Sequence, residues 1–276
     1  MLLRFTKMHG LGNDFVVVDR LSQHVRLNKS LVKRLGDRRF GIGFDQLLVV
    51  DHPRDPDVDF RYEIYNSDGN EVSQCGNGAR CFAKYVTDKH LTGRNPIRVE
   101  TNAGTLELQI MKDQQVRVNM GTPEFNPQQV PFRAPQRAST YTLEAAGRTF
   151  ELSAVSLGNP HAVIVVDDCA NTPVVELGQQ IGAHENFPQG VNVGFMQVLD
   201  QDTFELRVFE RGAGETLACG SGACAALVAG NSRGLLRNKA CAHVRGGLLQ
   251  LEWQGEGKPV FMTGPATTVY EGQIRI

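Results

Sequence analysis

Apolar and polar residues alternate along most of the chain in short runs, and these runs are separated by glycine, proline and asparagine. Such alternation is typical of strands whose side chains point to opposite faces of a sheet. It predicts strands in the second half of the chain and at five segments of the first half: Leu2–Thr6, Phe15–Asp19, Leu47–Val50, Phe60–Tyr65 and Leu106–Ile110. Helices are expected to be few.

Two segments have a helical pattern instead, and each follows a cysteine. The first, beginning near Ala79, has an apolar face and groups Arg80, Lys84 and Thr87 on the remaining face. The second, Ala223–Ala229, is apolar on every side, which indicates a buried helix. A helix without a polar face needs strands around it, so each such segment predicts a curved sheet wrapped around one central helix.

The segment Cys-Gly-X-Gly-Ala occurs twice, at Cys75 and at Cys219. Phe60 and Phe204 precede the two cysteines at the same spacing, and each begins an alternating strand. Further upstream, Leu-Gly-Asn at residues 11–13 is repeated at residues 157–159, and a similar tail follows each copy. These matching segments occur in the same order in both halves of the chain, which indicates an internal duplication whose period is the size of a domain.

The duplication defines the expected architecture. We expect the α/β (α+β) class, with two pseudo-symmetric lobes that each wrap a curved sheet around a central helix. A length of 276 residues gives each lobe enough chain for its own core. The expected limits are residues 1–119 with the C-terminal segment 265–276 for the first lobe, and residues 120–264 for the second. The proline-rich stretch Pro123–Pro135 is expected to carry the chain between lobes.

Charge and composition argue against nucleic acid or membrane as a ligand and favour a small molecule. The chain has 29 Lys and Arg against 30 Asp and Glu, which leaves no field that would gather nucleic acid or an acidic membrane. No apolar run approaches the ~20 residues that span a bilayer, so we expect a cytoplasmic protein with a small-molecule substrate. The six cysteines do not form the close pairs typical of zinc sites, and reduced thiols without a metal are expected.

The repeated cysteines are expected at the turns that open the two helices. Backbone N–H groups in a first helical turn have no intrahelical acceptor, and the helix dipole adds partial positive charge there. Such an end binds carboxylates and favours thiolate over thiol, which lowers a cysteine pKa from its reference value near ~8.5. Each copy therefore predicts an acid or base group beside an anion site.

Two equivalent acid–base groups suit the inversion of a carbon centre. A single base tends to return a proton to the face it came from, whereas a thiolate and a thiol on opposite faces invert the centre. Helix ends that face the substrate carboxylate would stabilise the charge that develops there. The residues alone thus favour a two-thiol racemase or epimerase.

The chain resembles the diaminopimelate epimerase family over its whole length. The resemblance rests on five segments: residues 9–15 (HGLGNDF), 66–69 (NSDG), 75–80 (CGNGAR), 158–161 (GNPH) and 210–222 (ERGAGETLACGSG). It implies interconversion of LL- and meso-2,6-diaminopimelate on the route to lysine and peptidoglycan. It also implies that Cys75 and Cys219 transfer the proton without pyridoxal phosphate or any other cofactor, in a cleft between the lobes.

The resemblance implies the remaining site residues as well. The implied substrate ligands are Asn13, Gln46, Asn66, Gly76, Asn77, Asn159, Asn192, Glu210, Arg211, Gly220 and Ser221. Carboxamides suit a diamino-dicarboxylate because they donate and accept without adding charge. The planar guanidinium of Arg211 is suited to a carboxylate at the unreacting end.

Further roles follow from the same resemblance. His161 and Glu210 would tune the two thiols, since an imidazolium favours a nearby thiolate and a carboxylate disfavours it. A homodimer is implied, and Tyr270 is a candidate contact, although a tyrosine near the C-terminus is as readily packed within its own lobe.

Three alternatives stay open. Proline racemases and hydroxyproline epimerases share the two-cysteine logic but lack this set of carboxamides with Glu210 and Arg211. A dithiol redox protein would need Cys75 and Cys219 to cycle as a disulfide, and neither lies in a CxxC pair. A non-catalytic amino-acid binding protein would also suit duplicated lobes.

Overall fold

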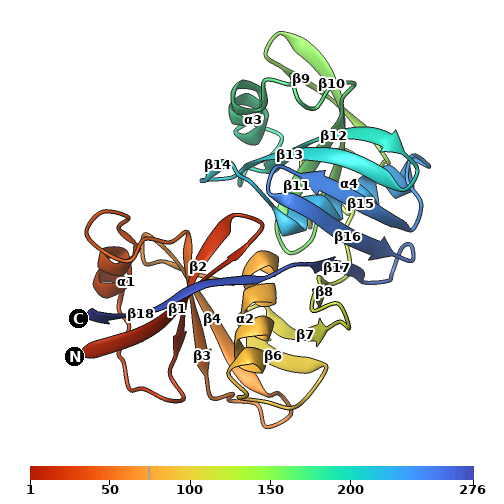
Figure 1. Cartoon of the computed structure of the whole chain (residues 1–276). Helices are drawn as coiled ribbons and strands as arrows, with labels where there is room; N and C mark the ends of the chain where they lie inside the picture. The colour runs from red at the N-terminus through yellow and green to blue at the C-terminus, as the bar shows by residue number, and fades with distance from the viewer. Residues whose placement is uncertain (74) are drawn as a thin grey trace. The chain divides into compact units, whose positions relative to one another are not determined.

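The computed structural model describes residues 1–73 and 75–276. These residues divide into two compact units, which we call the first unit (Met1–Val118 with Gly264–Ile276) and the second unit (Asn119–Thr263) (Figure 1). The domain limits expected from the sequence remain a proposal.

The first unit contains a continuous series of paired strands and two helices among its described residues. Its elements are β1 (Leu2–Gly10), β2 (Asn13–Asp19), α1 (Lys29–Gly36), β3 (Gln46–Asp51), β4 (Phe60–Asn66), β5 (Glu71–Val72), α2 (Gly76–Asp88), β6 (Ile97–Thr101), β7 (Gly104–Ile110), β8 (Val116–Asn119) and β18 (Thr267–Arg275).

The second unit repeats this series. Its elements are β9 (Tyr141–Ala145), β10 (Arg148–Ser156), β11 (Pro160–Val165), α3 (Val174–Gly182), β12 (Asn192–Asp200), β13 (Thr203–Glu210), β14 (Gly214–Glu215), α4 (Gly220–Ser232), β15 (Lys239–Val244), β16 (Gly247–Trp253) and β17 (Val260–Gly264).

Strand pairing is the same in both units. In the first, β2–β3 and β4–β6 are parallel, and the pairs β1–β2, β3–β4, β6–β7 and β7–β8 are antiparallel. In the second, β11–β12 and β13–β15 are parallel, and β10–β11, β12–β13, β15–β16 and β16–β17 are antiparallel. The expected mixed α/β class and the internal duplication are confirmed.

The last strand completes the first unit. β18 pairs antiparallel with β1, just as β9 pairs antiparallel with β10 in the second unit. The two ends of the chain also meet, because the Met1 amino group donates to the Ile276 carbonyl at 2.9 Å and the Ile276 N–H donates to the Met1 carbonyl at 2.9 Å.

Each unit holds a central helix against its strands. α2, orange in Figure 1, contacts β1, β2, β3 and β7, and α4 contacts β10, β11, β12, β15 and β16. Phe82 of α2 is fully buried, with its ring centroid 4.7 Å from that of Tyr62 and 6.1 Å from that of Phe60. Burial of one such side chain contributes about 2 kcal/mol.

α4 confirms the prediction of a buried helix, because every residue from Ala223 to Ala229 is buried. α2 corrects one sequence-based expectation. Arg80, which the pattern assigned to a polar face, is fully buried. Its guanidinium donates hydrogen bonds to the Pro265 carbonyl and to the side-chain oxygen of Asn77 inside the unit.

Two helices were not predicted from the sequence. α1 begins after Asn28, whose side chain accepts a hydrogen bond from the Leu31 N–H at 2.9 Å, a standard N-cap. α3 packs on β12 and β13, and a Cβ added at Gly178 would lie 2.3 Å from the ring of Phe209. Both helices are short, so tertiary packing supplies most of their stability.

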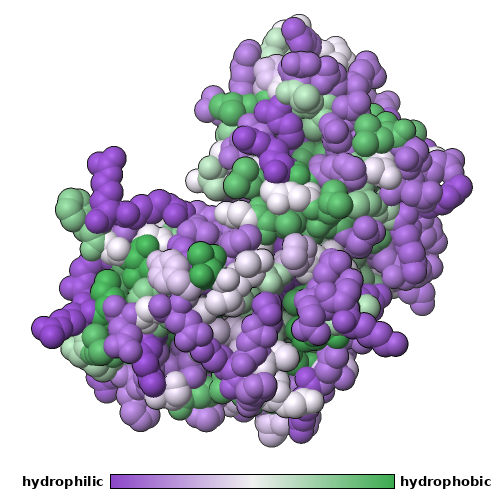
Figure 2. Space-filling model, viewed as in Figure 1, coloured by the Kyte–Doolittle hydropathy of each residue, from purple (hydrophilic) through white to green (hydrophobic). Residues whose placement is uncertain are grey.

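The face shown in Figure 2 is mainly hydrophilic, with small separate hydrophobic areas. Exposed large apolar side chains in the described residues include Phe40, Leu2 and Val269. None of the described helices is long and apolar enough to cross a membrane.

Candidate active site

Cys75 caps α2 at its N-terminus. Its backbone is extended (φ −149°, ψ 110°), and its Sγ accepts a hydrogen bond from the Gly78 N–H at 3.4 Å. The side chain is half-buried, and the Tyr62 hydroxyl donates to the Cys75 carbonyl at 3.4 Å. The sulfur therefore lies among the N–H groups of a first helical turn, as the sequence predicted.

The second glycine of the motif has a packing role. A Cβ at Gly78 would lie 2.4 Å from the Tyr62 hydroxyl and 3.1 Å from Leu48. Only glycine lets the helix turn approach these buried side chains so closely. The corresponding Cβ at Gly222 would lie 3.2 Å from the sulfur of Cys219.

Asn13 and Asn77 meet beside the Cys75 turn. Asn77, which is buried in the first turn of α2, donates from Nδ2 to Asn13 Oδ1 at 3.2 Å. Asn13 in turn donates from Nδ2 to Asp45 Oδ2 at 2.9 Å, and Arg80 donates from Nη1 to Asn77 Oδ1 at 2.9 Å. Two of the expected ligands are thus held by two charged residues that sequence reasoning missed.

Gln46 and Asn66 form a second pair in the first unit. They are register partners on β3 and β4, and Gln46 Nε2 donates to Asn66 Oδ1 at 2.9 Å. The Oε1 atom of Gln46 is buried and has no hydrogen-bond partner among the described residues. A buried acceptor without a partner costs free energy unless a ligand or water donates to it.

Cys219 occupies the corresponding N-cap position of α4 with a similar backbone (φ −115°, ψ 105°), but it lacks the side-chain capping hydrogen bond of Cys75, and its surroundings differ. Its side chain is buried, and its Sγ lies 3.8 Å from Ser221 Oγ. Burial raises the pKa of the Cys219 thiol well above its ordinary value, and the Glu210 carboxylate raises it further, against smaller lowering effects of Gly222 and Ser221. This thiol is therefore protonated at neutral pH.

Glu210 ends β13 and accepts a hydrogen bond from the Thr216 hydroxyl at 2.6 Å. Its effect on Cys219 has the direction that the sequence suggested for a carboxylate, because like charges disfavour each other.

His161 is the most perturbed imidazole. It is buried, and this burial, with a smaller effect of Arg211, lowers its pKa to about 3. Its Nε2 lies 3.1 Å from Asn159 Oδ1, and Asn159 Nδ2 donates to Ser221 Oγ at 3.3 Å. The ring is neutral at physiological pH, so the imidazolium considered from the sequence is disfavoured in this environment.

Asn192 organises the backbone around Arg211. Its Nδ2 donates to the Pro160 carbonyl at 3.0 Å, and its Oδ1 accepts from the Arg211 N–H at 3.0 Å. Arg211 Nη1 donates to the Gln189 carbonyl at 2.7 Å, and the residue is exposed. A guanidinium in this position retains further N–H donors for a carboxylate.

Gly76 and Gly220 are the first residues of α2 and α4, next to the two cysteines. Tyr270 lies on β18, opposite Lys7 of β1, and is 46% exposed. Its ring packs edge-on against Phe5, with centroids 6.0 Å apart. Tyr270 thus packs within its own unit and also presents surface to solvent.

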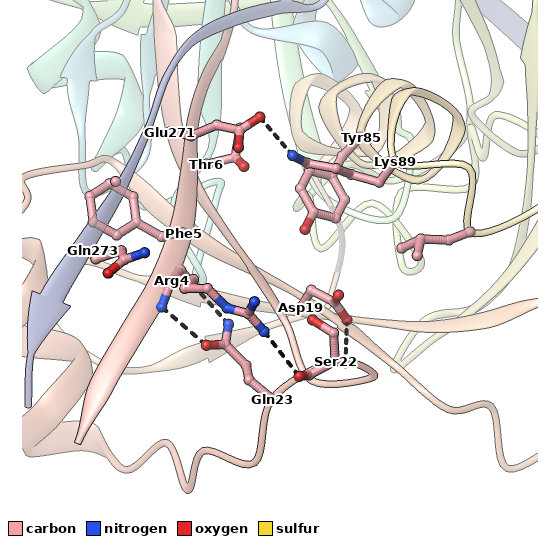
Figure 3. Close-up of a pocket in the computed structure, with 12 residues that line it drawn as sticks. Arg4, Phe5, Thr6, Asp19, Ser22, Gln23, Tyr85, Lys89, Glu271 and Gln273 are labelled. Carbon is pink, nitrogen blue, oxygen red and sulfur yellow. Dashed lines mark hydrogen bonds and ion pairs between the residues drawn. The ribbon is translucent and has the colours of Figure 1, made fainter.

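A separate pocket of about 380 Å³ lies at the other end of α2 from Cys75 (Figure 3). Tyr85 and Lys89 line it from the end of the helix, and Arg4 lines it from β1. Lys89 forms an ion pair with Glu271 at 2.6 Å across it. None of the residues expected from the sequence lines this pocket.

One of the two missed residues, Arg80, had a signal in the sequence. Arg80 follows the first Cys-Gly-X-Gly-Ala directly, whereas the second copy has Cys224 there, so the charge is an exception within an apolar pattern. Asp45 had no such signal. It meets Asn13 because β2 and β3 are parallel, with Phe15 opposite Gln46.

Comparison with known proteins places this geometry in a family. The sequence model described as "Diaminopimelate epimerase" matches residues 5–126 and 153–269. Proteins named diaminopimelate epimerase from Pseudomonas syringae pv. tomato (strain ATCC BAA-871 / DC3000) and Ectopseudomonas mendocina (strain ymp) are each 58% identical over 276 residues, covering 100% of both chains.

Solved structures share the fold at low sequence identity. A hydroxyproline epimerase from Agrobacterium vitis, with bound trans-4-hydroxy-L-proline, has a TM-score of 0.72 at 15% identity and covers 99% of this chain and 92% of its own. A predicted epimerase from Pseudomonas aeruginosa has a TM-score of 0.67 at 17% identity, with 99% of each chain covered. Together, the full-length sequence matches and the matched cysteine turns lead to one conclusion: this chain belongs to the diaminopimelate epimerase family.

Proposed function

We propose that this protein interconverts LL- and meso-2,6-diaminopimelate, in the formation of lysine and peptidoglycan precursors, through Cys75 and Cys219. The observation that carries the proposal is the pair of matched helix caps. Each unit offers one cysteine at the N-terminus of its central helix, with N–H groups and an asparagine amide beside it.

The chemistry balances with the two thiols alone. One cysteine, as thiolate, removes the α-proton and becomes a thiol, while the electron pair of the broken C–H bond is delocalised into the substrate carboxylate. The other cysteine, as thiol, delivers its proton to the opposite face and becomes the thiolate. The reverse reaction exchanges the roles.

The raised pKa of Cys219 supports a division of these roles at rest. We assign Cys219 as the protonated acid of the resting enzyme and Cys75 as its base. Glu210 serves the acid role by disfavouring the Cys219 thiolate. The neutral His161 holds the Asn159 amide rather than supplying a charge.

The proposed ligands divide by chemistry. The N–H groups that follow Gly76 and Gly220 would bind the reacting carboxylate, with Asn77 and Ser221 beside them. The buried Oε1 of Gln46 is suited to a substrate ammonium. Asn13, Asn66, Asn159 and Asn192 complete the polar lining.

Arg211 is proposed to hold the carboxylate at the unreacting end, because a planar guanidinium can donate two parallel hydrogen bonds. Its guanidinium is anchored by the Gln189 carbonyl, and its backbone by Asn192.

Two further features belong to the proposal. We infer a homodimer in which the half-exposed Tyr270 contributes a contact. We also infer a cytoplasmic location, which is consistent with six cysteines in thiol form.

The decisive experiment is proton NMR of the reduced, metal-free protein with LL-diaminopimelate in deuterated water. Loss of the α-hydrogen signal with appearance of the meso isomer is expected, and Cys75→Ala should abolish both. Exchange with proline or hydroxyproline but not with diaminopimelate would keep the mechanism and overturn the substrate. No exchange with any of them would overturn the enzymatic proposal.

A further inference from the structure

A chain of hydrogen bonds in the first unit runs from Asp45 to Arg80 through two carboxamides. Asn13 Nδ2 donates to Asp45 Oδ2 at 2.9 Å, Asn77 Nδ2 donates to Asn13 Oδ1 at 3.2 Å, and Arg80 Nη1 donates to Asn77 Oδ1 at 2.9 Å. This series of hydrogen bonds passes through the first turn of α2, next to Cys75.

The two ends of this chain determine its direction. An ionised carboxylate only accepts hydrogen bonds, and a guanidinium only donates them. The amide nitrogen of Asn13 must therefore face Asp45, and the amide oxygen of Asn77 must face Arg80. Reversal of either amide would place like groups against each other, so each carboxamide has a single compatible orientation.

Both ends are themselves fixed. Arg38 Nη2 donates to Asp45 Oδ1 at 2.8 Å, and Arg38 also binds Asp14 through two nitrogens, at 3.0 and 2.7 Å. Although burial alone raises the pKa of Asp14, hydrogen bonds from Arg38 and Lys7 lower it well below the usual range, so Asp14 stays charged. Arg80 is fully buried, and its Nε donates to the Pro265 carbonyl at 3.1 Å.

The second unit lacks these fixed ends at the equivalent place. Asn159 lies between His161 Nε2 and Ser221 Oγ, and a neutral imidazole nitrogen and a hydroxyl can each donate or accept. Cys224 stands where the first unit has Arg80. The orientation of Asn159 can therefore reverse, whereas that of Asn13 cannot.

We propose that Asp45 and Arg80 are positioning residues that hold Asn13 and Asn77 in one amide orientation beside Cys75. The catalytic consequence rests on the proposed function. Asn13 gives one N–H of Nδ2 to Asp45 and its oxygen to Asn77, so its second N–H is the group left for a ligand, which suits the substrate carboxylate. A site that is oriented before binding loses less free energy when substrate arrives.

The test measures amide orientation and kinetics in the full-length protein. Asp45→Ala removes the accepting end, and Asp45→Asn restores an oxygen that can accept. The matched control is Asp113→Ala, because Asp113 likewise accepts from a backbone N–H and a carboxamide, both of Gln115, each at 3.1 Å. Side-chain amide signals of 15N-labelled protein are assigned by their loss in Asn13→Ala and Asn77→Ala.

In Asp45→Ala we expect the amide signals of both Asn13 and Asn77 to shift and KM to rise about tenfold, the size of one lost hydrogen bond, with a smaller change in kcat. Asp45→Asn should recover part of the KM, and Asp113→Ala should match the wild type. Arg80→Gln, whose amide can donate or accept, should shift the Asn77 signals in the same way.

An unchanged Asn77 signal in Asp45→Ala, or lowered thermal stability with KM within twofold of the wild type, would overturn the positioning role. If the wild type shows no α-hydrogen exchange, the proposed function fails. The amide signals, which require no substrate, still decide the positioning proposal in that case.

Discussion

The two central helices have the same place in their units but different surroundings. α2 is capped by a half-buried cysteine and carries a buried arginine, whereas α4 is capped by a buried cysteine and has only apolar residues from Gly222 to Gly230. Strand order and pairing are nevertheless the same in both units. The two units therefore have equivalent strands and central helices, whereas the charge and burial around the two thiols differ.

The largest expected effect comes from removing either thiol. Cys75→Ala and Cys219→Ala should each lower the rate of epimerisation by at least about 100-fold, since each deletes a proton-transfer group. Cys241→Ala, which removes a thiol outside both turns, is the control. Chiral chromatography measures the rate of epimerisation. Substantial epimerisation by either Cys75→Ala or Cys219→Ala would contradict a two-thiol mechanism.

Arg211→Lys tests the far end of the substrate. A lysine keeps the charge but cannot donate two parallel hydrogen bonds, so KM should rise about tenfold or more with kcat changing less. Arg237→Lys alters an exposed arginine that forms an ion pair with Asp202, and it serves as the comparison. Steady-state kinetics in which both variants behave alike would remove Arg211 from the site.

Replacing the second glycine of each motif by alanine should change the free energy of unfolding by different amounts in the two units. Gly78→Ala places a methyl group against the buried Tyr62 and should destabilise the protein by about 1–3 kcal/mol. In Gly222→Ala the contacts are 3.1–3.3 Å, and the higher helix propensity of alanine, about 1 kcal/mol, offsets them. Urea denaturation of both variants measures the difference. Equal losses would show that the Tyr62 contact does not limit this turn.

Glu210→Gln should lower the pKa of the Cys219 thiol. Removing the carboxylate takes away the second cause of the raised Cys219 pKa, so this pKa should fall, while burial still keeps it above its ordinary value. The pH dependence of alkylation, read by mass spectrometry, reports this change. Glu205→Gln, on the same strand, should leave Cys219 unaffected.

The last comparison concerns His161, whose effect is small near neutral pH. Its folded-state pKa of about 3 lies below the ordinary 6.5, so below pH 6.5 the unfolded chain binds a proton that the folded protein does not. Stability is therefore lost as pH falls from 6.5 towards 3, by roughly 1 kcal/mol per pH unit. His161→Gln should weaken this dependence, whereas His243→Gln, an exposed residue, should not. Parallel pH profiles of the unfolding free energy would show that folding does not lower the pKa of His161.

The repeated pattern was enough to predict the duplication, the strands and the two capping cysteines. Alternation and the apolar run from Ala223 to Ala229 depend on local periodicity, which a sequence displays directly. α1 and α3 were missed because each is a short helix whose stability comes from the sheet it packs on.

The hydrogen bonds between polar side chains could not be predicted from the sequence pattern. Asp45 meets Asn13 only through the parallel register of β2 and β3, and the orientation of each amide depends on partners distant in sequence. Arg80 was misplaced because a charged residue in a helix ordinarily indicates an exposed face, and only the fold reveals its buried partners. The neutral state of His161 likewise depends on burial.

The pairing of β18 with β1 has a consequence for synthesis on the ribosome. The second unit is formed from one uninterrupted stretch, and all of its strands are made before β18. The first unit, although begun earlier, keeps the edge of β1 unpaired until β18 has been synthesised. The strand that completes the first unit is therefore made after the whole second unit.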